Sequence, residues 1–83
     1  MIYETIFIAM DHYSFNEDYR DVFLEDFFLS ANADEYTSMI IDGLSRDGDV
    51  LLSDKQKENA KRFANFVYNN IDPFFIKLKR GNH

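Results

Sequence analysis

The 83-residue chain contains no cysteine, and this absence excludes a disulfide framework and any thiolate metal site. We therefore expect a cytoplasmic protein. Long hydrophobic runs are also missing, since none approaches the ~20 residues that a membrane-spanning helix needs. The N-terminus carries Glu4 where a secretory signal peptide has its positive charge, so we expect no signal peptide and no membrane contact.

Proline occurs once and glycine three times, so little of the chain is available for tight turns. Hydrophobic residues make up 46% of the chain and aromatic residues 17%, with nine Phe and five Tyr. Each buried aromatic side chain removes about 150–250 Å² from water, which suits a small but dense core. We expect one helical domain over residues 1–80 and a frayed tail over residues 81–83.

Basic residues are scarce in the first two thirds of the chain. Residues 1–54 contain thirteen acids and two bases, a net charge of −11, whereas residues 55–83 contain seven bases and two acids, a net charge of +5. The sum is the overall charge of −6. Such a distribution bears on partners, because the acidic part repels nucleic acid and attracts basic surfaces.

The strongest helical pattern covers residues 53–71. Its apolar residues recur at the spacing of one helix face, and they are Ala60, Phe63, Ala64, Val67 and Ile71. Ser53 and Gln56 form a capping-box pattern at its start. Pro73 disfavours a helical conformation at the residue before it, and it also suits the first turn of a short last helix.

Three further helices are expected. Residues 1–13 favour a helix, although their β-branched and aromatic content also fits a strand that pairs with the alternating segment 74–79. A second helix is predicted over residues 15–29, capped by Ser14 and Glu17, and a third over residues 33–45, capped by Asn32 and Glu35.

Short connections complete the prediction of the fold. Residues 46–49 have the composition of a tight turn, and residues 50–52 form an apolar link that we expect to pack beneath the last two long helices. The fold class is therefore all-α, a compact antiparallel bundle of four to five short helices in a single domain. The alternative is an α+β fold in which N- and C-terminal strands pair.

The sequence offers no catalytic or metal centre. His12 is the one internal histidine, and no second ligand stands at a helical ligand spacing from it. The acid-rich loop 43–54 departs from the calcium-binding EF-hand at its first position, Gly43, and at its last, Asp54. Asp26 lies near the edge of an apolar helix face and is either a buried carboxylate or the margin of an interface. We expect no enzyme, no metal and no cofactor.

An acidic stripe on the second and third helices is the predicted partner-binding site. Acids spaced four residues apart place like charges on successive turns, which lowers helix stability and suggests a purpose other than folding. Solubility is the alternative explanation of such a stripe. Aromatic residues beside the acids add desolvated anchors to electrostatic steering. The predicted binding residues are Glu17, Asp18, Asp21, Glu25, Phe28, Asp34, Glu35 and Tyr36.

A basic cluster, Lys55, Lys57, Lys61 and Arg62, lies on the outer side of the long helix. Alone it suggests phosphate contacts, but the overall charge of −6 opposes nucleic acid, and Glu58 is placed to pair with Arg62. The other interpretations are a solvated helix surface, or pairing with the acidic helix within the chain or across a dimer.

The order of features from Asp18 to Ile71 resembles a known class of protein. An acidic aromatic helix is followed by a second acidic helix starting A-D-E-Y, a turn D-G-D-V-L-L-S and a long helix. This layout is similar to that of the small, acidic, all-helical immunity proteins of bacteriocin and contact-dependent growth-inhibition toxins. The resemblance implies a tight inhibitor that covers the basic active-site cleft of a nuclease toxin.

The leading hypothesis is a protein–protein inhibitor of the immunity or antitoxin type, whose partner is a basic protein, a toxin or a host nucleic-acid enzyme. A phage or mobile-element inhibitor that mimics nucleic acid is the first alternative. The second is a small oligomeric helical regulator that uses residues 55–62 on nucleic acid. Exposed aromatic residues also leave a homodimer open.

Overall fold

Four α-helices and one short 3-10 helix make up the part of the chain that the computed structural model describes, residues 2–71. They are α1 (Ile2–His12), η1 (Glu17–Tyr19), α2 (Arg20–Leu29), α3 (Ala33–Leu44) and α4 (Asp54–Asn70). No strand occurs among these residues, and the predicted all-α class with a single small domain is confirmed. The expected short helix after Pro73, the strand at 74–79 and the tail at 81–83 lie outside the described residues.

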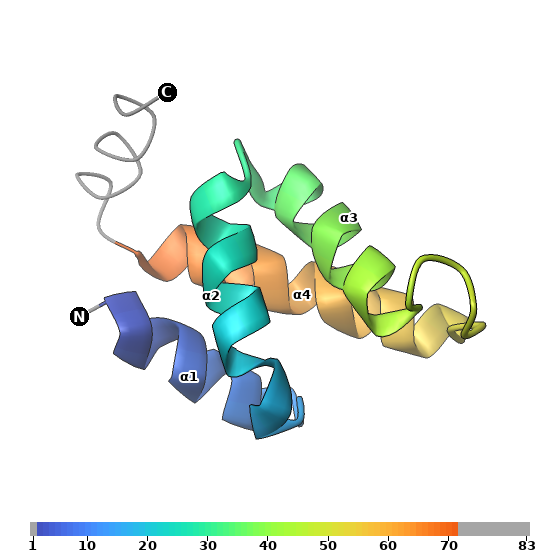
Figure 1. Cartoon of the computed structure of the whole chain (residues 1–83). Coiled ribbons are helices and arrows are strands. Elements are labelled where there is room, and N and C mark those ends of the chain that lie inside the picture. The colour runs from blue at the N-terminus through green and yellow to red at the C-terminus, as the bar shows by residue number, and fades with distance from the viewer. Residues whose placement is uncertain (1, 72–83) are drawn as a thin grey trace.

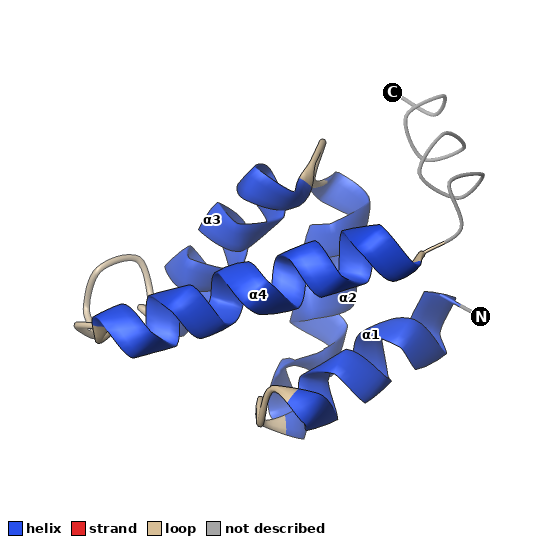
Figure 2. Cartoon of the chain, turned by 180° about the vertical axis from the view of Figure 1, so that it is seen from behind, coloured by secondary structure: helices blue, strands red, loops and turns tan. Residues whose placement is uncertain are grey.

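Helix α4 is the element on which the others assemble. Helices α1 and α3 both pack along it, and α2 contacts α1 and α3. Figure 1 shows α2 crossing in front of α4, and the view from behind in Figure 2 shows α4 in front, with α2 on the far side. The outward surfaces of α2 and α4 therefore lie on opposite sides of the molecule.

The sequence explains why α4 is long and well defined. The Ser53 side chain accepts a hydrogen bond from the Gln56 amide, and the Gln56 side chain accepts one from the Ser53 amide, which is the predicted capping box. All five residues of the predicted apolar stripe are buried, from Ala60 to Ile71. Phe63 lies at the centre of the core, where its ring contacts those of Phe15, Phe23 and Tyr36.

The N-terminal segment is a helix, so the prediction that favoured α1 is confirmed and the strand alternative for residues 1–10 is wrong over the described part. Ile6, Ala9 and Met10 are buried, at the i, i+3, i+4 spacing of one helix face. A strand would need a paired neighbour for its backbone groups, whereas helix α1 satisfies them internally and buries this face against α4.

The second helix begins later than predicted. Ser14 has a left-handed backbone, with φ of 60°, and does not cap it. Instead the amide of Ser14 donates to the carbonyl of Asp11 and the amide of Phe15 to that of Met10, a Schellman ending of α1. Residues 14 and 15 therefore belong to the end of α1, and Asn16 caps the chain that follows by accepting from the amide of Asp18.

Helix α3 begins at its predicted cap, Asn32, whose side chain accepts from the amide of Glu35. It ends in the predicted turn, where Arg46, Asp47 and Gly48 all have positive φ. The prediction for the link after the turn is wrong in part. Leu52 is buried, but Leu51 is 94% exposed.

Twelve buried residues form one continuous core. They come from all four α-helices and from Ile71, which directly follows α4. Phe23, Phe27, Tyr36 and Phe63 are the largest of its fully buried side chains. Within residues 2–71, no helix combines the length and the apolar character that crossing a membrane requires.

Candidate protein-binding surface

Four carboxylates line the outward side of η1 and α2, and we call this group the acidic surface: Glu17, Asp18, Asp21 and Glu25. All four side chains are exposed. No ion pair neutralises any of them within residues 2–71. Because Phe23 and Phe27 on the opposite side of α2 are fully buried, the core fixes which side of the helix faces the solvent.

Apolar side chains stand among these acids. Val22, Phe28 and Leu29 on α2 are 45%, 40% and 54% exposed. Phe28 was among the predicted binding residues, whereas Val22 and Leu29 were not. The sequence spacing could have identified them. Asp18, Val22, Glu25 and Leu29 follow one another at intervals of three or four residues, which places them on one side of a helix. Exposed apolar groups beside charges are typical of interaction surfaces.

Arg20, the base nearest to the acids in sequence, contacts an aromatic ring of α1. Its guanidinium lies over the Phe7 ring, 4.6 Å from the ring centre, in a cation–π contact between α2 and α1. Within residues 2–71, no ion pair joins Arg20 to the four acids.

Asp34 and Glu35 lie in the first turn of α3 and are exposed. The Glu35 carboxylate accepts a hydrogen bond of 3.1 Å from the amide of Ala31. Acids in a first turn also interact favourably with the helix dipole. Both residues thus have a structural role at the start of α3, and their binding role stays a prediction.

Tyr36 is fully buried, so it presents no surface to a partner, and its place among the predicted binding residues is corrected here. Its hydroxyl donates a 2.8 Å hydrogen bond to the carbonyl of Phe23. Burial raises the pKa of the Tyr36 phenol, and the charges of Asp26 and Tyr68 raise it further. The physical reason is the helix period: Tyr36 shares the core-facing side of α3 with Ile40.

Asp26, singled out at the edge of the apolar side, is half-buried. Desolvation raises the pKa of its carboxyl, and the charge of neighbouring Glu25 raises it further. Half-burial fits the edge of the apolar helix face that the sequence indicates, and a place at the margin of an interface stays a prediction. The Asp26 carboxylate thus borders the acidic surface and contributes to the electrostatic potential there.

Ser30 and Tyr68 form a polar contact that the sequence did not reveal. The Ser30 hydroxyl donates to the carbonyl of Phe27 at 2.8 Å and lies 2.6 Å from the Tyr68 hydroxyl, which also donates to the Ser30 carbonyl at 3.3 Å. These bonds join the end of α2 to α4, although the two residues are 38 positions apart. They hold α2, and with it the acidic surface, on the core.

The basic cluster of α4 is exposed, as expected for the outer side of that helix. Arg62 pairs with Glu58 at 3.4 Å, which confirms the predicted pairing. Helix α2 crosses on the far side of α4 in Figure 2, and no ion pair joins the basic cluster to the acidic surface within residues 2–71.

His12 lies at the end of α1, exposed, with its ring stacked 6.4 Å from that of Phe66. This places it against an aromatic side chain instead of among carboxylates. Among residues 2–71, no three or more His, Cys, Asp or Glu side chains are grouped so that they could hold a metal ion.

Comparison of the chain with protein-family models, with curated proteins and with solved structures finds no match in any of the three. The functional argument therefore depends on the surface itself.

Proposed function

We propose that the protein is a small inhibitor of the immunity or antitoxin type, which binds a basic, nuclease-like protein through the acidic surface. One observation carries the proposal: four exposed carboxylates without an ion-pair partner in the described chain share one side of η1 and α2 with exposed apolar side chains. The proposed activity is binding, with no catalytic step and no cofactor.

The chemistry of such a complex follows from this arrangement. A protein that acts on nucleic acid has a basic cleft for phosphates, and carboxylates in that cleft occupy the places of the phosphates. Charge complementarity accelerates association, with rate constants up to about 10⁸–10⁹ M⁻¹s⁻¹ at low salt. Val22, Phe28 and Leu29 provide the apolar contact that charges alone do not give.

The cost of the acidic surface to the fold also supports a binding role. Glu25 lies one turn after Asp21, and like charges at this spacing destabilise a helix by about 0.2–0.5 kcal/mol per pair. A lysine in place of either acid would remove that cost and would leave the protein soluble. Retaining both acids is consistent with selection for a basic partner.

Capture from the source cell tests the proposal. The bait is the full chain, the matched variants are Asp21→Lys/Glu25→Lys and Asp42→Lys/Glu58→Lys, and bound proteins are identified by mass spectrometry. Both variants change the net charge equally, but only the first alters the acidic surface. We expect a basic nucleic-acid enzyme with wild type and the second variant, and its loss with the first. Equal capture by all three contradicts the proposal.

The partner's identity separates the two forms of the hypothesis, because a toxin indicates an immunity protein and a host enzyme indicates a phage or mobile-element inhibitor. The nucleic-acid regulator is a second candidate, supported by the exposure of Lys55, Lys57 and Lys61. Reversing Asp21 and Glu25 distinguishes it, because removing repulsion strengthens nucleic-acid binding while it weakens binding to a basic protein.

A further inference from the structure

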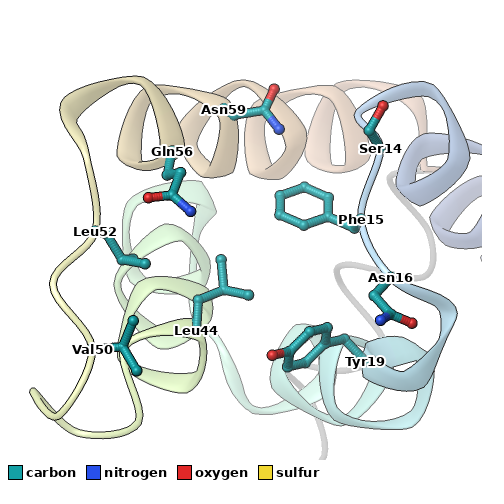
Figure 3. A pocket seen from close by; sticks show the side chains of 9 residues that line it. All are labelled: Ser14, Phe15, Asn16, Tyr19, Leu44, Val50, Leu52, Gln56 and Asn59. Atoms are coloured by element: carbon teal, nitrogen blue, oxygen red, sulfur yellow. The ribbon is translucent and has the colours of Figure 1, made fainter.

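A pocket of about 290 Å³ opens between the segment 14–19, the end of α3, the link after it and the start of α4 (Figure 3). Its apolar wall comes from Phe15, Tyr19, Leu44, Val50 and Leu52. With Gln56 and Asn59 of α4, the lining residues belong to four separate parts of the chain, so the pocket exists only in the folded protein. None of its lining side chains carries a charge.

The aromatic part of the wall is held by the core. The Phe15 ring packs edge-on against the rings of Phe23 and Phe63, with centres 5.2 Å apart in each case. The Tyr19 ring stacks on Phe23, 5.6 Å away. An occupant therefore meets rings whose positions are already set, which lowers the entropic cost of binding.

Polar side chains in the wall are also fixed. The Gln56 side-chain oxygen accepts from the Ser53 amide at 2.8 Å, and the Asn16 side-chain oxygen accepts from the Asp18 amide at 2.9 Å. Their nitrogen atoms face the pocket (Figure 3) and provide N–H donors. Donors at the edge of an apolar pocket suit an occupant that carries carbonyl oxygens, as a peptide does.

The size of the pocket limits what it can hold. Sites for drug-sized ligands and cofactors enclose about 300–1,000 Å³, and a closed cavity of about 150 Å³ holds benzene. A pocket of about 290 Å³ that is open on one side thus has room for one aromatic side chain and its backbone. It is too small for a nucleotide cofactor.

The charge around the pocket indicates which residues flank the aromatic side chain in a bound peptide. Segments 14–19 and 44–56, which form most of the wall, contain five acids and two bases, a net charge of −3. Glu17 and Asp18 of the acidic surface lie between Asn16 and Tyr19 of the pocket, so the two features adjoin. A basic peptide segment complements this surrounding, and an acidic one is repelled.

We infer that the pocket receives an aromatic side chain of the basic partner, flanked in the partner by Lys or Arg. This inference rests on the proposed function and adds to it the anchor residue of the complex. The acidic surface supplies electrostatic steering, and the pocket supplies the desolvated contact at which binding energy is concentrated.

Two synthetic peptides test the inference, acetyl-Lys-Arg-Phe-Arg-Lys-amide and the same peptide with Ala replacing Phe. Each is titrated into the ¹⁵N-labelled full chain at about 10 mM salt, where the Debye length is about 30 Å. Burial of the Phe ring is expected to make the first peptide bind about 10- to 100-fold more tightly than the second. Amide shifts should centre on residues that line the pocket.

Val50→Trp places a large ring in the pocket wall. This variant is expected to bind the Phe and Ala peptides with about equal affinity. Leu51→Trp is the matched control, because Leu51 is 94% exposed and does not line this pocket. It should keep the preference. Circular dichroism checks that both variants fold.

Equal affinity of the two peptides for wild type, or a Phe preference that survives Val50→Trp, overturns the inference. In either case salt-dependent binding of both peptides leaves the acidic surface and the proposed function standing. Failure of the proposed function has a different signature, the equal capture of a cellular partner by wild type and Asp21→Lys/Glu25→Lys.

Discussion

Replacing Glu25 by lysine should make the protein more stable and, at the same time, a poorer binder. Glu25 is an exposed residue in the middle of α2, one turn after Asp21. Lysine and glutamate have similar helix propensities, and no packing is lost at an exposed position. The change therefore isolates the electrostatic cost of the acidic surface.

The magnitude follows from the pair of charges. The substitution removes a repulsion of about 0.2–0.5 kcal/mol and creates an attraction of similar size, in the favourable order of acid before base. The expected gain in the free energy of unfolding is about 0.4–1 kcal/mol. For a domain of this length, that gain raises Tm by about 2–8 °C. Glu25→Gln, which only removes the repulsion, should give about half of this gain.

Thermal unfolding followed by circular dichroism at about 10 mM and again at about 1 M salt is the assay. Screening should remove most of the gain at high salt. Glu58→Lys is the control of opposite sign, because it breaks the 3.4 Å pair with Arg62 and should lower Tm. An unchanged or lower Tm for Glu25→Lys at low salt refutes the reasoning, as does a gain that high salt leaves intact.

Three further outcomes are expected. Tyr36→Phe removes the hydrogen bond to the Phe23 carbonyl and should lower the free energy of unfolding in urea by about 0.5–1.5 kcal/mol, and an unchanged midpoint would show that this bond contributes nothing. Burial and the Glu25 charge raise the pKa of Asp26 above its unfolded value of about 3.9. The folded protein therefore binds the proton more tightly than the unfolded chain. As a result, the free energy of unfolding falls as the pH rises from below the unfolded pKa through the raised folded pKa. Asp26→Asn should remove this loss in Tm measured across that range, and an identical pH profile in both proteins would contradict the assignment. Arg46, with φ of 51°, is strained, so Arg46→Gly should raise Tm by a few degrees, and a fall would show that its side chain makes a stabilising contact.

Much of the fold follows from local patterns in the sequence. The apolar stripe and the capping box of residues 53–71 specify α4, because a single face and a marked start leave few alternatives. The caps and turn that bound α3 were predicted for the same reason. Local signals of this kind depend only on residues within a few positions of each other.

An error arises where two local signals compete, and features are missed where distant parts of the chain decide the outcome. Ser14 and Glu17 fit a capping box, but the ending of α1 uses the backbone of Ser14, so η1 and α2 start later. The hydrogen bonds between Ser30 and Tyr68 join positions that no periodic pattern relates. The pocket has the same origin, since its wall comes from four separate segments.

The candidate site was predicted only in part. The charges of Glu17, Asp18, Asp21 and Glu25 were visible in the sequence, and the structure presents them together on one exposed side. Tyr36 was included because aromatic residues near acids suggest anchors, yet its side chain is fully buried in the core. Sequence shows which residues share a helix face, but packing decides which face is covered.

The association rate constant of the captured partner tests the central claim most directly. It is measured by stopped-flow for wild type and for Asp21→Lys/Glu25→Lys, at low and at physiological salt. If the acidic surface steers a basic protein, the variant associates at least about tenfold more slowly at low salt, and the difference shrinks as salt rises. Equal association rates for the two proteins at low salt would contradict a binding role for the acidic surface.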